Sequence, residues 1–296
     1  MSQPTSSYVG RFAPSPTGPL HLGSLFTALA SYLDARSHSG LWLLRIDDLD
    51  IPRNVSGARE SILRCLERFG LLWDRDVFIQ SQQLPKYESA LAYLLDKQWL
   101  YGCRCSRKSL EKSAIYPGYC RNAQLKIDSS TALRLKTQHV HIEFDDVLNG
   151  IIKHQIANQD GDFIVRRRDQ IIAYQFAVVV DDFQQGVTHV VRGADLLDST
   201  PKQIYLQQLL GYPTPSYMHL PIVVDQQGAK LSKQTLAAPV NDTNPARTLF
   251  LVLQLLQQNP PAELVHVDTQ TLLDWAIAHW QPLALKKVRA IPSPIH

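Results

Sequence analysis

The chain has 296 residues, of which 45% are hydrophobic and 19% are charged, and its formal net charge at pH 7 is +3. This composition excludes a largely disordered chain, and the small net charge does not by itself indicate a nucleic-acid-binding protein, although a local basic face is compatible with it. The sequence has no apolar run of about eighteen residues and no export signal at its N-terminus, so we expect a cytoplasmic protein without a membrane segment.

The N-terminal part alternates between strand and helix patterns. Residues 8–12 are expected to form a strand, and residues 22–36 a helix, because apolar side chains recur there at helical spacing. Residues 41–46 form a near-continuous apolar run, which is typical of a strand buried on both faces of a parallel sheet. Two more helices are expected at 56–69 and 85–97. Strand, helix and strand predict a βαβ unit that opens an α/β domain.

The pattern changes after these helices and later returns. Residues 101–160 contain three of the four cysteines and two short β-like runs, which indicates an insertion. The α/β pattern resumes in the apolar run at 173–182, continues through 188–192 and leads into an amphipathic helix that ends near Leu210. The other expected elements are β-like runs at 131–136 and 140–144, a strand at 220–224, a turn at 225–228, and helices at 244–258 and 269–280.

The expected domain organisation follows from these patterns. Two halves of one α/β domain flank the insertion, and a small helical tail follows the second half. The predicted boundaries are 1–100 for the first half, 101–160 for the insertion, 161–240 for the second half and 241–296 for the tail.

Two segments far apart in the sequence combine the chemistry of phosphate binding. Residues 11–24 connect the first strand to the first helix, where backbone N–H groups and the helix dipole favour an anion. Within this loop Arg11 can grip a carboxylate, His21 can donate to a phosphate, and Gly23 allows a nucleotide to approach the backbone. Residues 230–233 place two lysines on one loop, suited to the charge that develops as pyrophosphate leaves. Each pattern alone is common in ordinary helix starts and solvated loops, but together they indicate activation of a substrate by ATP.

Both segments resemble signatures of class I aminoacyl-tRNA synthetases in the form found in glutamyl-tRNA synthetases. Residues 11–24 resemble the first signature, usually written HIGH, and residues 230–233 resemble the second, usually written KMSKS. Residues 45–53 and 191–197 resemble two further segments of the glutamyl family, and the four motifs cover roughly residues 8–235. The resemblance implies an α/β fold with a class I synthetase nucleotide-binding (Rossmann-like) domain, a zinc-bearing insertion, a small helical C-terminal tail and no anticodon-binding domain.

The resemblance also implies roles for particular residues. The implied glutamate-binding residues are Arg11, Phe12, Ala13, Pro14, Ser15, Asp47, Tyr174 and Arg192. The implied ATP-binding residues are His21, Gly23, Ser24, Lys230 and Lys233, with His21 and Lys233 as the catalytic residues and Mg²⁺ accompanying ATP. Asp47 departs from the family, which usually has glutamate there, so either the backbone sits closer or a water bridges the gap. A core-edge tyrosine and a salt-bridging arginine are the alternatives for Tyr174 and Arg192.

Four residues of the insertion match the zinc-binding positions of the family: Cys103, Cys105, Tyr116 and Cys120. Three thiolates suit zinc, and a tetrahedral structural site needs a fourth donor, for which tyrosine is unusual. Three reduced thiols in a solvent-facing hairpin are the alternative. The arginine run at 166–168 is expected either to contact RNA phosphate or to form a solvated face.

The cysteine insertion and the short segment after the second signature resemble a truncated paralogue of glutamyl-tRNA synthetase, which attaches glutamate to the queuosine base in the anticodon of tRNA(Asp). This resemblance implies ATP and L-glutamate as substrates, the tRNA(Asp) anticodon stem-loop as partner, one structural Zn²⁺ and a monomeric protein. Two alternatives stay open. One is a compact glutamyl- or glutaminyl-tRNA synthetase that charges the tRNA 3′ end, and the other is a non-catalytic tRNA-binding module.

Overall fold

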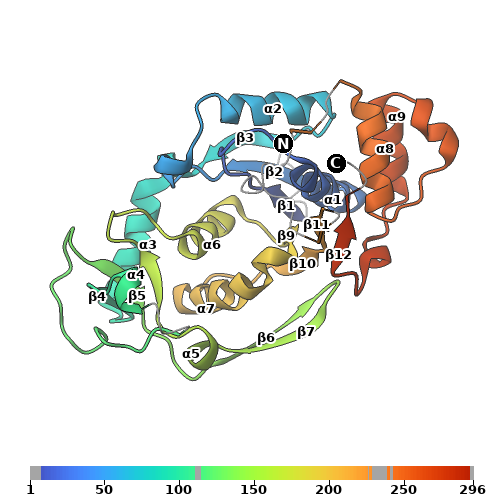
Figure 1. Ribbon diagram of the computed structural model, residues 1–296. Helices are drawn as coiled ribbons and strands as arrows, with labels where there is room; N and C mark the ends of the chain where they lie inside the picture. The colour runs from blue at the N-terminus through green and yellow to red at the C-terminus, as the bar shows by residue number, and fades with distance from the viewer. Residues whose placement is uncertain (1–7, 111–114, 226, 229–238, 241–242, 294–296) are drawn as a thin grey trace, which may run out of the picture.

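The computed structural model describes residues 8–110, 115–225, 227–228, 239–240 and 243–293, which build a layered α/β protein (Figure 1). The helices are α1 (Leu22–Ser37), α2 (Ala58–Arg68), α3 (Leu84–Asp96), α4 (Arg107–Leu110), α5 (Ile156–Gln159), α6 (Tyr174–Gln185), α7 (Thr200–Leu210), α8 (Pro245–Leu255) and α9 (Thr269–Ala278). None of the helices in these ranges has the length and apolar character needed to span a membrane.

The strands form one main sheet and two smaller ones. They are β1 (Val9–Phe12), β2 (Leu41–Ile46), β3 (Asp74–Ile79), β4 (Leu100–Cys103), β5 (Ala132–Leu135), β6 (His141–Asp146), β7 (Gly150–Gln155), β8 (Phe163–Arg166), β9 (His189–Gly193), β10 (Ser216–Leu220), β11 (Ile222–Val224) and β12 (Ala290–Pro292). One group of strands has the order β1-β2-β3, with parallel pairs, and another has the order β7-β6-β10-β9. In the second group β9, β10 and β6 are parallel and β7 is antiparallel to β6.

Hydrogen bonds between Val9 and Thr188 join the two groups into the main sheet. The Val9 N–H donates to the Thr188 hydroxyl over 2.8 Å, and the Thr188 N–H donates to the Val9 carbonyl over 2.9 Å. The strand that follows β1 in the chain, β2, therefore lies on one side of β1, while β9 lies on the other side. Open α/β sheets bind their ligands at the carboxyl ends of the strands at such a reversal of strand order.

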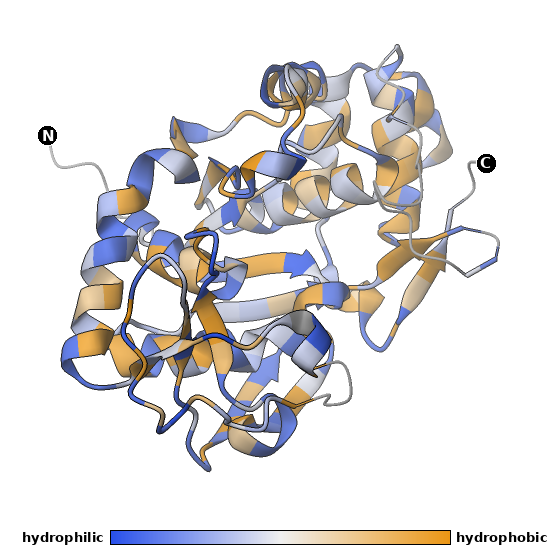
Figure 2. Cartoon of the chain, turned by 60° about the vertical axis from the view of Figure 1, so that its left-hand side comes forward, coloured by the Kyte–Doolittle hydropathy of each residue, from blue (hydrophilic) through white to orange (hydrophobic). Residues whose placement is uncertain are grey.

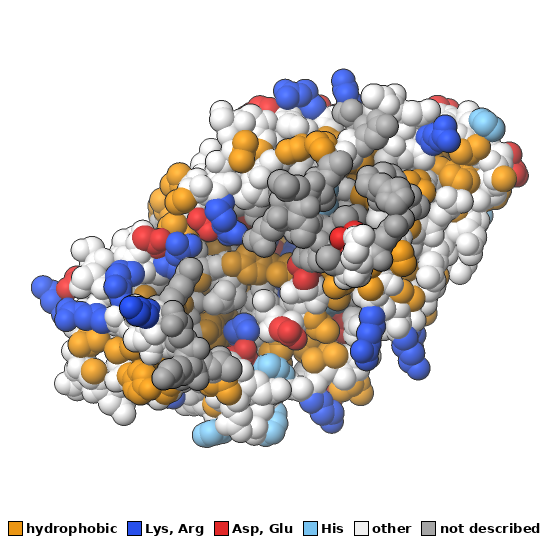
Figure 3. Space-filling view, viewed as in Figure 1, with side chains coloured by type: hydrophobic (Ala, Val, Ile, Leu, Met, Phe, Trp, Pro, Cys, Tyr) orange, Lys and Arg blue, Asp and Glu red, His pale blue; other side chains and the backbone are white. Residues whose placement is uncertain are grey.

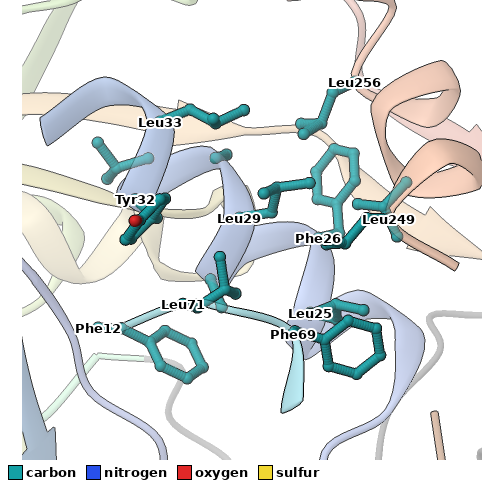
Figure 4. Close-up of a cluster of buried hydrophobic side chains, with 14 of the residues drawn as sticks. Phe12, Leu25, Phe26, Leu29, Tyr32, Leu33, Phe69, Leu71, Leu249 and Leu256 are labelled. Atoms are coloured by element: carbon teal, nitrogen blue, oxygen red, sulfur yellow. The ribbon is translucent and has the colours of Figure 1, made fainter. Parts of the chain in front are cut away.

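Helix α1 packs between the sheet and the C-terminal helices. Its side chains from Leu22 to Ala35 are mostly buried because both of its sides are covered. Figure 4 shows Phe26 and Leu29 of α1 gathered with Leu249 and Leu256 of the α8 segment. Burying one such leucine or phenylalanine contributes about 1.5–3 kcal/mol, so the tail is an integral part of this core.

The tail helices begin where the sequence predicts capping residues. The side chain of Asn244 accepts a hydrogen bond from the Arg247 N–H over 3.1 Å at the start of α8. At the start of α9 the side chain of Asp268 accepts one from the Thr271 N–H over 2.9 Å. The tail is not purely helical, because Ile291 of β12 lies opposite Val223 of β11 in a parallel pair.

A second core lies beneath α3, α6 and α7 and extends to an antiparallel sheet in the order β4-β5-β8. The helices in Figure 2 alternate between hydrophilic and hydrophobic stretches, as expected of elements with one face on a core. Within residues 101–160, β4 and β5 belong to this small sheet, whereas β6 and β7 extend the main sheet. The insertion predicted from the sequence thus contributes to both sheets.

The predicted strands at 8–12 and 41–46 are confirmed, as are the helices at 22–36, 56–69 and 85–97, within two residues at most boundaries. The apolar run at 173–182, whose element type the pattern left open, forms most of α6. The strand predicted at 220–224 is present as β11, but it begins only at Ile222, and Leu220 ends β10. Pro221 separates β10 from β11, because proline has no N–H to continue a ladder, and the two strands pair with different partners.

Candidate active site

A cavity of about 270 Å³ opens at the carboxyl ends of β1 and β9. Most residues that the sequence motifs single out lie in its wall, although they come from both halves of the chain. The lining residues from that set are Arg11, Phe12, Ala13, Pro14, Ser15, His21, Gly23, Ser24, Tyr174 and Arg192. The face of the molecule in Figure 3 is hollowed near its middle, where hydrophobic, acidic and basic side chains lie close together.

The loop after β1 leads directly into the N-terminus of α1. His21 is the capping residue, and its Nδ1 accepts a hydrogen bond from the Ser24 N–H over 3.3 Å. Its Nε2 lies 3.0 Å from the Ser24 hydroxyl oxygen. The first turn of α1 carries no acidic residue, so the positive end of the helix dipole faces the cavity without a competing anion. Such a helix start favours phosphate binding.

Arg11 is buried, and Asp182 of α6 holds its guanidinium. The Arg11 Nε donates to Asp182 Oδ1 over 3.2 Å, and Arg45 Nη1 donates to the same oxygen over 2.6 Å. Burial alone would raise the pKa of Asp182, but the two guanidinium groups outweigh burial and lower it. Asp182 is therefore ionised and fixes the cavity-lining arginine from behind.

Asp47 lies next to this cluster and not among the residues that line the cavity. Its backbone N–H donates to the Pro14 carbonyl over 3.0 Å, which ties it to the loop after β1. Its carboxylate accepts a hydrogen bond from Arg45 Nε over 2.8 Å. Burial raises the pKa of Asp47, and the Arg45 charge opposes that rise.

Three residues without a role in the motif analysis, Arg45, Asp181 and Asp182, are buried at the back of the site. Asp181 accepts hydrogen bonds from the Tyr87 hydroxyl over 2.7 Å and from the Gln80 side-chain amide over 2.6 Å. Burial raises the pKa of Asp181 to about 7, even though Arg45 lowers it. The available signal was a pair of acidic residues inside an apolar run, where charges are rare unless they are partnered.

Arg192 enters the cavity from β9 and is held by uncharged acceptors. Its Nε donates to His219 Nε2 over 3.0 Å, and its Nη2 donates to the Thr200 hydroxyl over 2.8 Å. Its Nη1 is buried and has no hydrogen-bond partner among the described residues. A buried guanidinium N–H without an acceptor is costly, and an anionic ligand in the cavity would satisfy it. Tyr174, the first residue of α6, lines the same cavity and is 39% exposed.

Lys230 and Lys233 lie outside the described residues, but one flank of their segment is in the cavity wall and the other flank pairs with the loop that leads into α1. On the leading side, Ile222 and Val223 of β11 are in the cavity wall. On the trailing side, the Val240 N–H donates to the Leu20 carbonyl over 2.8 Å, beside a β-bridge between Pro239 and His21.

Three cysteines of the inserted sheet meet in one cluster. The Sγ atoms of Cys103, Cys105 and Cys120 lie within 4.8 Å of one another, and those of Cys105 and Cys120 are 3.6 Å apart. The Tyr116 hydroxyl lies 3.5 Å from Cys103 Sγ and 3.6 Å from Cys105 Sγ. Burial would raise the pKa of Cys120, but hydrogen bonds from the Arg104 backbone and from Tyr116 bring it down to about 7. The three thiols and the Tyr116 hydroxyl are therefore already gathered at one point of the structure.

The arginine run at 166–168 has protein partners at each position. Arg166 lies 3.5 Å from the Glu88 carboxylate, and Arg167 pairs with Asp169 over 2.6 Å. Arg168 donates to the Arg104 carbonyl over 2.5 Å and so ties the β8 loop to the cysteine loop. Contact with RNA remains a prediction for these residues.

The family that matches this chain is described as tRNA synthetases class I (E and Q), catalytic domain, and the match covers residues 8–117 and 119–256. The chain belongs to this class of synthetases, and the resemblance seen in its motifs is confirmed. Two solved structures share the fold. They are a glutamate tRNA ligase from Elizabethkingia meningosepticum in complex with its amino acid (TM-score 0.79) and a glutamate-tRNA synthetase from Elizabethkingia anophelis (TM-score 0.81). Each is 24% identical to this chain, which spans 66% and 68% of their lengths and is itself covered over 96% and 97%.

Relatives of nearly the same length assign the chain to one family within this class. The chain is 47% identical over 290 residues to the glutamyl-Q tRNA(Asp) synthetase of Pseudomonas aeruginosa PAO1, which covers 98% of this chain and 99% of that relative. It is 50% identical over 280 residues to the protein of the same name from Aromatoleum aromaticum, covering 92% of this chain and 89% of the relative. The Acinetobacter baylyi relative is 49% identical over 282 residues, with 95% of both chains covered. Within its class the chain belongs to the glutamyl-Q tRNA(Asp) synthetase family.

Proposed function

We propose that this protein activates glutamate with ATP and transfers it to the queuosine base in the anticodon of tRNA(Asp). Two findings support the proposal. Relatives with that printed name are 47–50% identical over nearly the whole chain. The cavity at the reversal of strand order is lined by two buried arginines, one of which presents an unpaired N–H, as a site for a dicarboxylic amino acid requires. That unpaired Arg192 Nη1 is the observation on which the substrate assignment rests.

The pocket has a candidate partner for each charged group of glutamate. Arg11 and Arg192 bind the carboxylates of glutamate, and the Tyr174 hydroxyl and the loop from Phe12 to Ser15 complete the pocket. We assign the ammonium group to Asp47 through a bridging water, because Asp47 is absent from the cavity wall and its carboxylate already accepts from Arg45.

ATP binds with its phosphates at the N-terminus of α1. His21, Gly23 and Ser24 lie there, and Lys230 and Lys233 contribute positive charge from the second signature. An oxygen of the glutamate α-carboxylate attacks the α-phosphorus in line, the bond to pyrophosphate breaks, and glutamyl-adenylate forms. Mg²⁺ accompanying ATP would neutralise part of the charge on the phosphates. Catalysis comes from positioning and electrostatic stabilisation, since this displacement needs no covalent help from the protein.

The second step transfers the activated amino acid to RNA. A hydroxyl of the queuosine cyclopentenediol attacks the carbonyl carbon of the mixed anhydride, its proton passes to the departing phosphate or to solvent, and AMP leaves. Nucleotides of an anticodon loop can be splayed out of their stack, so such an acceptor is able to enter the cavity.

We assign a structural Zn²⁺ to Cys103, Cys105, Cys120 and Tyr116. Tetrahedral zinc with Zn–S bonds of about 2.3 Å separates its sulfur ligands by about 3.8 Å, and an oxygen ligand lies about 3.5 Å from each sulfur. The 3.6 Å between Cys105 and Cys120 Sγ and the 3.5 and 3.6 Å from Tyr116 to two sulfurs fit this geometry. The metal would hold the loop that carries Cys105 against the inserted sheet.

The decisive experiment incubates the protein with ATP and labelled glutamate, together with tRNA(Asp) that either contains or lacks queuosine. We expect label only on the queuosine-containing tRNA, with retention of label after removal of the terminal CCA. Label that depends on an intact CCA end would instead identify a synthetase that charges the 3′ end. Absence of glutamate-dependent ATP–pyrophosphate exchange would leave only a tRNA-binding module.

A further inference from the structure

Two fully buried residues behind Arg192 are used by none of the steps above. Asp146, His219 and Arg192 lie on the neighbouring strands β6, β10 and β9, in that spatial order. His219 stands directly opposite Arg192 in the parallel register of β10 and β9. The exposed fractions of the three residues are 0%, 1% and 4%, so water does not compete for their hydrogen bonds.

Asp146 fixes the protonation of the imidazole. Its Oδ2 lies 2.6 Å from His219 Nδ1 and also accepts from the His219 backbone N–H over 3.1 Å. Its Oδ1 accepts from the Asn149 backbone and side-chain N–H groups over 3.0 and 2.6 Å. Every group around this carboxyl is a donor, so Asp146 is ionised, and its pKa is lowered despite burial. The Nδ1 atom of His219 therefore carries the proton.

The remaining imidazole nitrogen then has only a lone pair to offer. His219 Nε2 accepts from Arg192 Nε over 3.0 Å, which requires a neutral ring. Burial lowers the pKa of His219 and so keeps the ring neutral. The Thr200 hydroxyl accepts from Arg192 Nη2 and lies 3.0 Å from His219 Nε2 and 3.3 Å from the Leu196 carbonyl, to either of which it can donate. The two acceptors of Arg192, His219 and Thr200, are thus themselves oriented by hydrogen bonds to neighbouring groups.

This arrangement differs from that of the other arginine in the cavity wall. Asp182 neutralises Arg11 directly, whereas no carboxylate of the described residues forms an ion pair with Arg192. The charge of Asp146 is separated from Arg192 by the width of an uncharged ring. Arg192 consequently keeps its positive charge while two of its three nitrogens are fixed, and its Nη1 is left for a ligand.

We propose that Asp146 and His219 are positioning residues for amino-acid recognition. Through the tautomer of His219 they hold the Arg192 guanidinium in the orientation that binds a carboxylate of the amino-acid substrate. The inference rests on the proposed function, because it takes glutamate as the ligand of Arg192. Neither residue touches the substrate.

Two substitutions of His219 separate its two hydrogen bonds. In His219→Gln the amide reaches the position of Nε2 and offers its oxygen to Arg192. In His219→Asn the shorter amide reaches only the position of Nδ1, so the bond to Asp146 is kept and the one to Arg192 is lost. Asp146→Asn replaces an acceptor by an amide that can donate to Nδ1, which favours the opposite tautomer and sets an N–H against Arg192 Nε. His141→Asn is the matched control, since His141 is exposed at the far end of β6.

The readout is glutamate-dependent ATP–pyrophosphate exchange, with KM measured separately for glutamate and for ATP. We expect His219→Asn and Asp146→Asn to raise KM for glutamate about tenfold or more, as loss of a hydrogen bond to a charged group does, with little change in kcat or in KM for ATP. We expect His219→Gln and the control to stay within about twofold of the unmodified protein. Thermal unfolding identifies any variant that does not fold. If either His219→Asn or Asp146→Asn fails to fold, the other of these two variants decides.

A wild-type KM for glutamate in His219→Asn and Asp146→Asn would overturn the inference and leave the proposed function intact. So would a His219→Gln variant as impaired as His219→Asn, or a rise in KM for ATP equal to that for glutamate, because both indicate a merely structural role. If the unmodified protein shows no exchange with glutamate, the proposed function fails and the inference fails with it.

Discussion

The substitution Asp182→Asn tests the buried charge cluster behind the cavity. In the native protein Asp182 Oδ1 accepts from Arg11 over 3.2 Å and from Arg45 over 2.6 Å, and all three side chains are less than 10% exposed. The amide has almost the same shape but no charge, so two guanidinium groups lose their shared counter-ion. Removing one partner of a buried ion pair costs about 3 to 5 kcal/mol. That loss is a large fraction of the roughly 5–15 kcal/mol by which a typical protein is stable.

Urea-induced unfolding followed by circular dichroism measures this effect as a fall in the transition midpoint at unchanged slope. Because Arg11 lines the cavity, the variant is also expected to raise KM for glutamate in pyrophosphate exchange. Asp145→Asn, an exposed change on β6, serves as control and should alter the unfolding free energy by less than about 0.5 kcal/mol. A loss below about 1 kcal/mol in Asp182→Asn would show that the guanidinium groups find other acceptors, and the reasoning about this cluster would be refuted.

Further outcomes follow from the same structure. The pKa of Asp181 is about 7 in the folded protein, above its value in the unfolded chain, so the stability it contributes at low pH is lost as pH rises through 7. Asp181→Asn should therefore gain stability relative to the unmodified protein between about pH 4.5 and 8, and a constant difference in unfolding free energy would contradict this. Cys120→Ser should lower bound zinc from about one ion per chain and reduce the thermal midpoint, whereas zinc-free, fully stable native protein would remove the metal site. Arg192→Met should raise KM for glutamate by about a hundredfold, and a small change would mean that another group binds the carboxylate. Lys233→Ala should abolish pyrophosphate exchange, so full activity would refute the role given to this lysine.

Motifs in the sequence identified the residues of the cavity wall but not the reason they meet. Arg11 and Arg192 come together because β1 and β9 are neighbours in the main sheet, through the hydrogen bonds between Val9 and Thr188. The hydrophobic pattern of each segment does not indicate which strand lies beside it in the sheet. The resemblance to the synthetase family indicated that the two segments belong to one site. The order of the strands in the sheet is the physical reason that they meet.

Local patterns predicted elements well where one face is apolar and the other polar. They left the run at 173–182 open because α6 is buried on most sides, which removes the alternation that distinguishes a helix from a buried strand. The same burial concealed Asp181 and Asp182, whose partners Arg45, Tyr87 and Gln80 are distant in the sequence. Asp146 and His219 were missed for a related reason, since neither lies in a motif and their pairing follows from strand order alone.

The pairing of β11 with β12 joins the cavity wall to the C-terminal tail. Val223, in the cavity wall, has Ile291 as its ladder partner, and the Ser293 N–H donates to the Val224 carbonyl over 2.7 Å. Because β11 leads into the segment that carries Lys230 and Lys233, its pairing with residues 290–292 fixes the strand from which that segment starts. The last strand of the described residues thus supports one wall of the cavity from outside it.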